Sequence, residues 1–268
     1  ELAPASALSP LPGAEAAGSA FNLYARETAG FADRVAEAVA VLREVAAAGP
    51  AVQASSLGAE DMVITHLINA NQLPIGIFVL ETGALHPETL TLLDTLRSQQ
   101  ATRTHAPLTV YTPAQEAVVQ FVAREGKDAM YRGIELRKAC CGIRKLEPLE
   151  RALSGQKAWI TGLRREQSGA RAQVPLRDES DLASTGRLKF NPLAGWSWTD
   201  VWFYIQHHAV PYNPLHDRFM PSIGCAPCTR AIAVGEDFRA GRWWWEDEAA
   251  KECGLHVKTE EPKAQVTA

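Results

Sequence analysis

The sequence lacks long hydrophobic runs, an excess of basic residues and internal repeats. Its most continuous apolar stretch, residues 75–80, is far shorter than the roughly 20 residues needed to span a bilayer. The formal net charge of −4 argues against nucleic acid as the main partner, because nucleic-acid-binding surfaces are normally basic. We therefore expect neither a membrane nor a nucleic acid as partner, and any anion site must be a local concentration of Lys and Arg.

The composition is that of an ordinary globular protein. Hydrophobic residues make up 46% and charged residues 22% of the 268 residues, which is enough apolar material for a sizeable core. The N-terminal segment lacks the basic and then apolar pattern of a signal peptide, and its Ala, Pro and Gly content predicts a flexible leader, which we place at residues 1–30. We expect a cytoplasmic protein whose five cysteines are metal ligands or reactive thiols.

Strand-like and helical patterns alternate along the chain up to residue 161. The predicted strands cover residues 51–55, 75–80, 108–111 and 158–161. The predicted helices cover residues 31–47, 61–70, 113–125 and 144–153, and a further helix begins at Pro87. This alternation predicts an α/β fold in which helices cover both faces of a parallel sheet.

In such a sheet, ligands bind beyond the carboxyl ends of the strands. That rule points to the loops at residues 55–61, 81–86 and 162–168. Residues 162–186 are polar and rich in arginine, and they predict a long mobile loop. Beyond Phe190 the alternation stops.

The cysteines form two pairs and a single residue. Cys140 and Cys141 are adjacent, Cys225 and Cys228 form a C-x-x-C pair, and Cys253 stands alone. Four thiolates complete either a zinc site or a [4Fe–4S] cluster. Neighbouring side chains diverge, which suits the separated iron corners of a cluster better than one small ion. The spacing favours a cluster, and zinc, a redox thiol pair and buried cysteines remain alternatives.

Three motifs resemble one known family in sequence and order. Residues 140–149 (CCGIRKLEPL), 224–229 (GCAPCT) and 251–256 (KECGLH) are similar to those of assimilatory adenylyl-sulfate reductases, the iron–sulfur type of the phosphoadenylyl-sulfate reductase family. The resemblance implies a Rossmann-like sheet of the adenine nucleotide alpha hydrolase type, with a C-terminal cluster-binding and catalytic segment. It also implies a [4Fe–4S] cluster on the four paired cysteines and a catalytic nucleophile at Cys253.

The resemblance also divides the chain. It implies a nucleotide-binding α/β domain over residues 31–229, which carries the cluster ligands. A mobile C-terminal segment with the catalytic cysteine follows over residues 230–268.

Residues 55–61 (SSLGAED) lie between a predicted strand and a predicted helix. Hydroxyls, a glycine and the N–H groups of a helix N-terminus suit a phosphate, although the same residues also make ordinary turns. The segment resembles the family's modified pyrophosphate loop, with Leu57 in the place of a small hydroxyl residue, and Glu81 replaces the usual Asp of a second loop. The substrate-binding residues that the resemblance implies are Ser55, Ser56, Gly58, Thr82, Gly83, Lys145, Arg164, Arg165, Arg239 and Arg242.

The function implied by the resemblance is thioredoxin-dependent reduction of adenosine 5′-phosphosulfate to sulfite and AMP, through an enzyme S-sulfocysteine, in sulfate assimilation and cysteine biosynthesis. The alternatives are the same chemistry on 3′-phosphoadenosine 5′-phosphosulfate, an adenylating ATP pyrophosphatase, and a non-catalytic cluster-bearing redox sensor. The sequence does not determine whether the chain forms a homo-oligomer. Five scattered histidines receive no chemistry: His66, His86, His207, His208 and His216.

Overall fold

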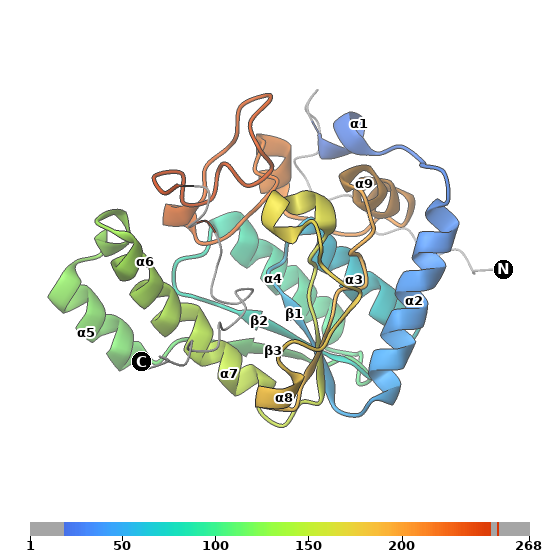
Figure 1. The fold of residues 1–268 in the computed structure, drawn as a ribbon, viewed down its shortest axis with the longest axis horizontal. Helices are drawn as coiled ribbons and strands as arrows, with labels where there is room; N and C mark the ends of the chain where they lie inside the picture. The colour runs from blue at the N-terminus through green and yellow to red at the C-terminus, as the bar shows by residue number, and fades with distance from the viewer. Residues whose placement is uncertain (1–18, 248–250, 252–268) are drawn as a thin grey trace, which may run out of the picture.

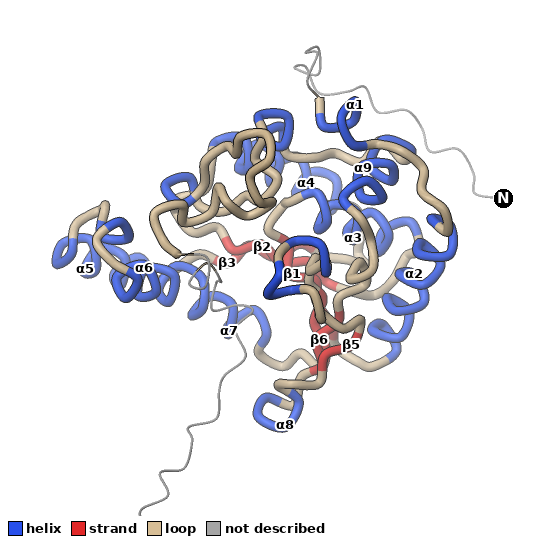
Figure 2. The backbone as a smooth tube through the Cα atoms, turned by 45° about the horizontal axis from the view of Figure 1, so that its top comes forward, coloured by secondary structure: helices blue, strands red, loops and turns tan. Residues whose placement is uncertain are grey.

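The computed structural model describes residues 19–247 and residue 251, and it is built around a six-stranded sheet (Figures 1 and 2). The strands are β1 (Ala51–Ser55), β2 (Gly76–Leu80), β3 (Leu108–Tyr111), β4 (Ala158–Ile160), β5 (Arg177–Asp178) and β6 (Leu188–Phe190), in the spatial order β3-β2-β1-β4-β6-β5. The β1–β2, β1–β4, β2–β3 and β4–β6 pairs are parallel, and the β5–β6 pair is antiparallel. The predicted α/β fold is confirmed, with a mostly parallel sheet.

The helices are α1 (Ala20–Tyr24), α2 (Phe31–Ala47), α3 (Ala59–Ala70), α4 (Pro87–Gln100), α5 (Gln115–Glu125), α6 (Ile134–Cys141), α7 (Glu147–Leu153), α8 (Leu182–Thr185) and α9 (Trp198–His207). The five helices predicted before residue 154 are present, whereas α1 and α6 were not predicted. A π-helical turn (Gly142–Leu146) joins α6 to α7. In the part of the chain that the structure describes, no helix combines the length and the apolar character that crossing a membrane requires.

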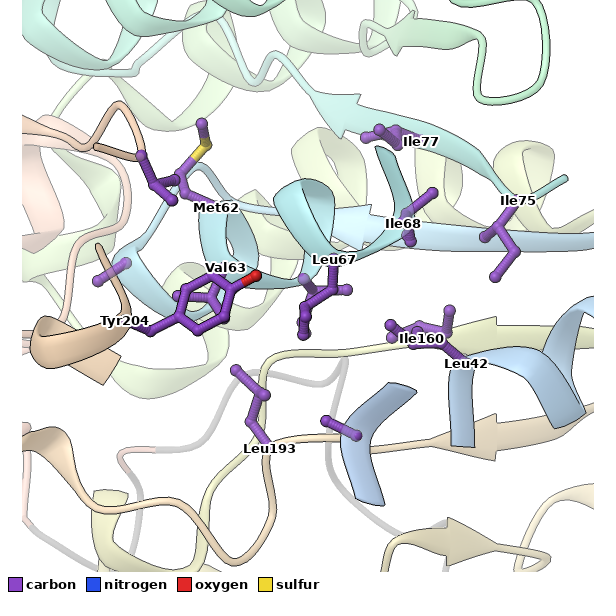
Figure 3. Packing of buried hydrophobic residues seen from close by; sticks show 14 of the residues in the cluster. Leu42, Met62, Val63, Leu67, Ile68, Ile75, Ile77, Ile160, Leu193 and Tyr204 are labelled. Carbon is purple, nitrogen blue, oxygen red and sulfur yellow. The ribbon is translucent and has the colours of Figure 1, made fainter. Parts of the chain in front are cut away.

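Helices cover both faces of the sheet because successive strand residues point to opposite sides. Ile77 and Ile160 belong to the large core that α2, α3 and α4 bury on one face (Figure 3). Phe78 and Trp159, their neighbours in sequence, pack instead with α7 on the other face. Figures 1 and 2 show α5, α6 and α7 on the opposite side of the sheet from α2 and α3.

The strand order reverses at β1. From β1 the chain proceeds outward through β2 and β3 on one side, and it returns through β4 to β6 and β5 on the other. The connections that leave β1 and β4 therefore diverge to opposite faces, which opens a crevice at the carboxyl ends of these two strands. The topology predicts the ligand site at this point.

Two stretches differ from the sequence prediction. The segment predicted as a mobile loop over 162–186 contains β5 and α8, and β6 follows it directly. These elements have two to four residues each, too few to show a periodic pattern. Within the predicted leader, α1 packs on α9, with the Phe21 ring 5.7 Å from the Trp202 ring, so residues 20–24 belong to the folded part. Trp243, in the predicted C-terminal segment, is buried.

Candidate active site at the carboxyl edge of the sheet

A cavity of about 200 Å³ opens where the strand order reverses. Its walls come from the loops after β1, β2 and β4, the π-helical turn and segments near residues 221–225 and 238–243. Seven of the ten predicted substrate-binding residues line it: Ser55, Ser56, Gly58, Thr82, Lys145, Arg239 and Arg242. The structure thus brings together predicted residues from four separate stretches of the chain.

The loop after β1 is shaped by its own side chains. Asp61 Oδ2 accepts hydrogen bonds from the backbone N–H and the hydroxyl of Ser56, both at 2.7 Å. Leu57 adopts the left-handed conformation, with φ of 62°, and its N–H donates to Ser55 Oγ at 3.2 Å. Its side chain is fully buried in the core. A leucine therefore serves here as a core anchor of the loop, in the place where the sequence comparison expected a hydroxyl contact.

Asp61 also holds the loop after β4 close to the loop after β1. A Cβ atom on Gly162 would lie 2.5 Å from Asp61 Oδ1, so only glycine allows this approach. Burial raises the pKa of the Asp61 carboxyl to about 6, and its hydrogen bonds to Ser56 oppose that rise. A carboxyl group that titrates near neutrality therefore lies at the crevice between β1 and β4.

This pKa shift predicts a pH-dependent stability difference between the protein and its Asp61→Asn variant. The carboxyl keeps its proton up to about pH 6 in the folded chain but loses it near 3.8 when unfolded, so its contribution to folding falls as pH rises between these values. Relative to the parent, the neutral variant should gain about 2 kcal/mol from pH 4 to pH 7.5, at about 1.4 kcal/mol per pKa unit. Anaerobic urea unfolding of both proteins across this range measures the gain, and parallel stability curves would contradict it.

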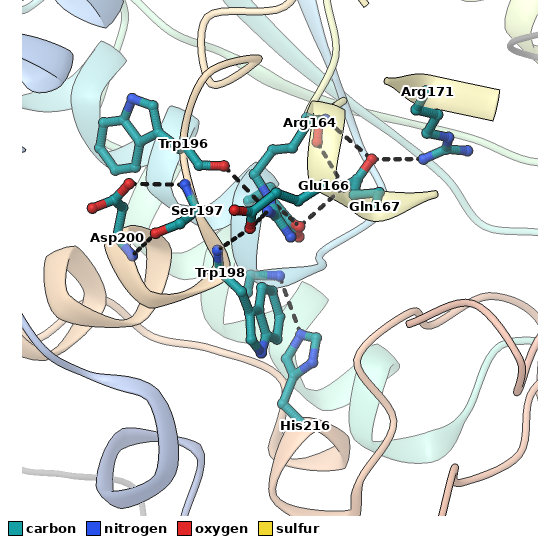
Figure 4. Close-up of polar contacts among 12 residues, drawn as sticks. Arg164, Glu166, Gln167, Arg171, Trp196, Ser197, Trp198, Asp200 and His216 are labelled. Atoms are coloured by element: carbon teal, nitrogen blue, oxygen red, sulfur yellow. Dashed lines mark hydrogen bonds and ion pairs between the residues drawn. The ribbon is translucent and has the colours of Figure 1, made fainter. Parts of the chain in front are cut away.

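Arg164 is fully buried behind the cavity (Figure 4). Its Nε donates to Glu60 Oε1 at 2.8 Å, and its Nη1 donates to the Trp196 carbonyl at 3.2 Å. Gln167 Nε2 donates to the same Glu60 oxygen at 3.0 Å, and Arg171 Nη1 donates to Gln167 Oε1 at 2.7 Å. The arginine-rich segment after β4 is thus ordered by a buried acid from the first turn of α3.

Three predicted substrate-binding residues lie outside the cavity lining. Arg164 is held by Glu60, and Arg165 is exposed, with its Nε donating to the Val174 carbonyl at 2.9 Å. Gly83, at φ of 70°, donates its N–H to Glu81 Oε1 at 2.7 Å. Glu81 therefore shapes the turn after β2. Of the arginines in the segment after β4, Arg171 lines the cavity, whereas Arg164 and Arg165 do not.

His216, which received no role from the sequence, supports the first turn of α3. Its Nε2 accepts the Ala59 N–H at 3.1 Å, and its ring packs edge-on against Trp198 and Trp202 (Figure 4). Burial lowers the pKa of this imidazole to about 4, so the ring is neutral and can accept. It joins the loop after β1 to the segment that leads to Cys225. The sequence could not reveal this role, because Ala59 lies 157 positions away from His216 in the chain.

The paired cysteines lie next to the cavity. Cys225 and Cys228 form a buried cluster with Met130 and Trp243, and Cys140 packs against it. Cys141 is buried at the end of α6, outside that cluster of contacts. All four are free thiols. Burial raises the pKa of Cys140, and it raises the pKa of Cys228 to about 11.

Two basic residues of the π-helical turn connect the cysteines to the cavity. Lys145 lines the cavity, and its charge lowers the pKa of both Cys140 and Cys228 against the effect of burial. Arg144 Nη1 donates to the Thr82 carbonyl at 2.6 Å, and the Thr82 hydroxyl lies 3.3 Å from Cys225 Sγ. The cavity and the thiols therefore share a wall.

The cavity is cationic. Lys145, Arg171, Arg239 and Arg242 line it, whereas of its two acids Glu60 is paired with Arg164 and Asp61 has a raised pKa. Within the described residues, Arg242 Nε is buried without a hydrogen-bond partner. The arrangement suits a ligand with several anionic oxygens.

The predicted nucleophile Cys253 lies outside the described residues. The preceding chain is described up to residue 247 and at Lys251, whose carbonyl accepts a hydrogen bond from Arg239 Nη2 at 2.8 Å. Because Arg239 lines the cavity, the backbone two residues before Cys253 lies beside the site.

Comparison with known proteins gives consistent matches. A family model described as the phosphoadenosine phosphosulfate reductase domain matches residues 50–231. An adenosine 5′-phosphosulfate reductase of Allochromatium vinosum is 54% identical over 212 residues, which cover 79% of this chain and 80% of that protein. One from Burkholderia cepacia is 53% identical over 209 residues, which cover 78% and 81%.

A solved structure has a similar fold. The phosphate complex of a phosphoadenylyl-sulfate reductase from Candida auris matches with a TM-score of 0.57 at 25% identity, covering 75% of this chain and 98% of that chain.

Proposed function

Because the chain belongs to the phosphoadenosine phosphosulfate reductase family, we propose that it reduces adenosine 5′-phosphosulfate to sulfite and AMP, with thioredoxin as electron donor, in cytoplasmic sulfate assimilation and cysteine biosynthesis. The observation that carries the proposal is the cationic cavity at the strand-order reversal, which shares a wall with the paired cysteines. Two relatives that are 54% and 53% identical to this chain are named adenosine 5′-phosphosulfate reductase.

The nucleotide is proposed to bind along the loop after β1. Ser55, Ser56 and Gly58 would border the phosphate near the N-terminus of α3, where the helix dipole favours an anion. Lys145, Arg239 and Arg242 would hold the sulfate half, and Thr82 would border it. The ion pair with Arg164 offsets the negative charge of Glu60, so that this carboxylate repels the anionic ligand less.

The chemistry of the donor set fits a [4Fe–4S] cluster held by Cys140, Cys141, Cys225 and Cys228. Three of these thiols share one apolar, buried region, where a protonated thiol is favoured unless a metal stabilises the thiolate. Within the described residues no three Cys, His, Asp or Glu side chains are grouped as ligands of a single ion. The indole Nε1 of Trp243 is buried beside the thiols without a hydrogen-bond partner there, and cluster sulfur could accept from it. Bound there, the cluster would supply structural support, because it would join the two cysteine pairs.

The reaction is proposed to proceed in two displacements. The Cys253 thiolate attacks the sulfate sulfur, an S–S bond forms, and the bond from sulfur to the bridging oxygen breaks with AMP as leaving group. Lys145, Arg239 and Arg242 stabilise the negative charge that develops on the oxygens. A thioredoxin thiolate then attacks Cys253 Sγ, sulfite leaves, and the second thioredoxin thiol reduces the mixed disulfide. Two residues span at most about 7 Å, so Cys253 is within reach of the site from Lys251.

One assay separates this proposal from its alternatives. Anaerobically purified protein is given reduced thioredoxin with adenosine 5′-phosphosulfate or with its 3′-phosphorylated form, and sulfite is measured. We expect the higher kcat/KM with the unphosphorylated nucleotide, because relatives about 50% identical to this chain are named for it. Equal or greater efficiency with the 3′-phosphorylated form would overturn the substrate choice. No sulfite from either would leave an adenylating enzyme or a redox sensor as the better account.

A further inference from the structure

A buried ion pair joins α6 to the chain beyond the cavity. Arg137 Nε and Nη2 donate to the two carboxylate oxygens of Glu246 at 2.9 and 2.7 Å. The two side chains are 1% and 2% exposed. Burying two charges costs several kcal/mol, and apolar residues of similar volume often serve a fold as well or better. Fold stability alone is therefore a weak reason for this pair.

The pair fixes Trp243 in a strained turn. The Arg137 guanidinium lies 4.6 Å from the centroid of the Trp243 ring, and the Arg242 guanidinium lies at the same distance. Trp243 has a φ of 41°, in the left-handed region that disfavours a side chain, and the Glu246 N–H closes the turn on the Trp243 carbonyl at 2.9 Å. Arg137 and Glu246 thus determine where this indole lies, and the indole in turn contacts Arg242.

The Arg242 guanidinium has further close contacts that limit its freedom. A Cβ atom on Gly224 would lie 2.3 Å from Arg242 Nη2, so the guanidinium is seated directly on that glycine. Its Nη1 donates to Ser222 Oγ at 3.3 Å. Arg239 lies 6.0 Å from the same Trp243 ring and donates to the Lys251 carbonyl. Both cavity arginines therefore depend on the placement of Trp243.

We infer that Arg137 and Glu246 are positioning residues that set Arg239 and Arg242 against the sulfate half of the substrate. Neither belongs to the cavity lining, so they act through Trp243. The inference rests on the proposed function, because it concerns the two arginines assigned to the sulfate. The pair anchors the cationic segment to the helix that carries Cys140 and Cys141.

The test is an apolar replacement of both charges, Arg137→Met with Glu246→Met, which leaves no buried charge unpaired. Arg230→Met with Glu236→Met is the matched control, because that pair is also bidentate, at 2.9 and 2.8 Å, but partly exposed and outside the cavity lining. Iron content, the thermal midpoint, AMP affinity, and the single-turnover rate of Cys253 sulfonation are measured for all three proteins.

We expect the Arg137/Glu246 double variant to keep its iron and its fold and to bind AMP within about threefold of the parent, because AMP carries no sulfate. Its sulfonation rate at low substrate should fall roughly 30-fold or more, the effect of misplacing charged groups by a fraction of an ångström. The control variant should stay within about twofold. Unchanged sulfonation in the double variant, or a loss that only parallels loss of iron or of fold, would overturn the inference. If the parent itself is not sulfonated, the proposed function fails instead.

Discussion

The Cys253→Ser variant is expected to retain iron, visible absorption and AMP binding while sulfite formation falls by roughly 10³-fold or more, as when other covalent nucleophiles are removed. A serine hydroxyl at neutral pH is a far weaker nucleophile than a thiolate. The backbone at Lys251, two residues before Cys253 in the sequence, lies beside the cavity, because its carbonyl accepts a hydrogen bond from Arg239. Steady-state sulfite release with thioredoxin, together with iron analysis and AMP titration, measures the three properties.

The result depends on separating loss of the nucleophile from loss of the site. If the variant loses iron along with activity, Cys253 is a ligand or a structural residue. If it keeps substantial activity, another group attacks the sulfate sulfur. Either outcome would contradict the assigned role.

A Cys228→Ser variant should lose most of its iron and acid-labile sulfide, and its free energy of unfolding should drop by several kcal/mol, on the order of a structural metal site. Cys228 lies in a buried cluster with Cys225, Met130 and Trp243, and these residues come from distant parts of the chain. Losing the group that joins them leaves buried polar atoms and weakly packed loops. Iron and sulfide analysis and anaerobic thermal unfolding measure both effects.

The matched control is the Cys253→Ser variant. It also replaces a cysteine of this chain by serine, but it should leave the iron content unchanged. Stoichiometric zinc without labile sulfide in anaerobically prepared protein would contradict the cluster. Full iron retention in Cys228→Ser would remove this residue from the ligand set.

The sequence predicts the elements that carry long local patterns. Helix α4 begins at Pro87 as expected, and β2 coincides with the apolar run that precedes Glu81. Periodicity finds such elements because it depends on neighbours in the chain. Strand β6 has three residues with a lysine at its centre, and it forms by pairing with β4. Pairing of that kind leaves no trace in local composition.

The candidate site was predictable in part, for a similar reason. The serines and the glycine after β1, Lys145 and the arginines Arg239 and Arg242 were found through motifs. Arginine-rich stretches usually indicate solvated loops, so the burial of Arg164 against Glu60 could not be anticipated. Its partner lies 104 positions away in the chain. Two consecutive acids at the start of α3, Glu60 and Asp61, were the one local signal available.

Mass analysis of the protein incubated with adenosine 5′-phosphosulfate, without thioredoxin, tests the central claim most directly. The account predicts a mass gain of one sulfonate on the peptide that contains Cys253, and reduced thioredoxin should remove it with release of one equivalent of sulfite. No mass gain, or a sulfonate on Cys140 or Cys141, would contradict the account.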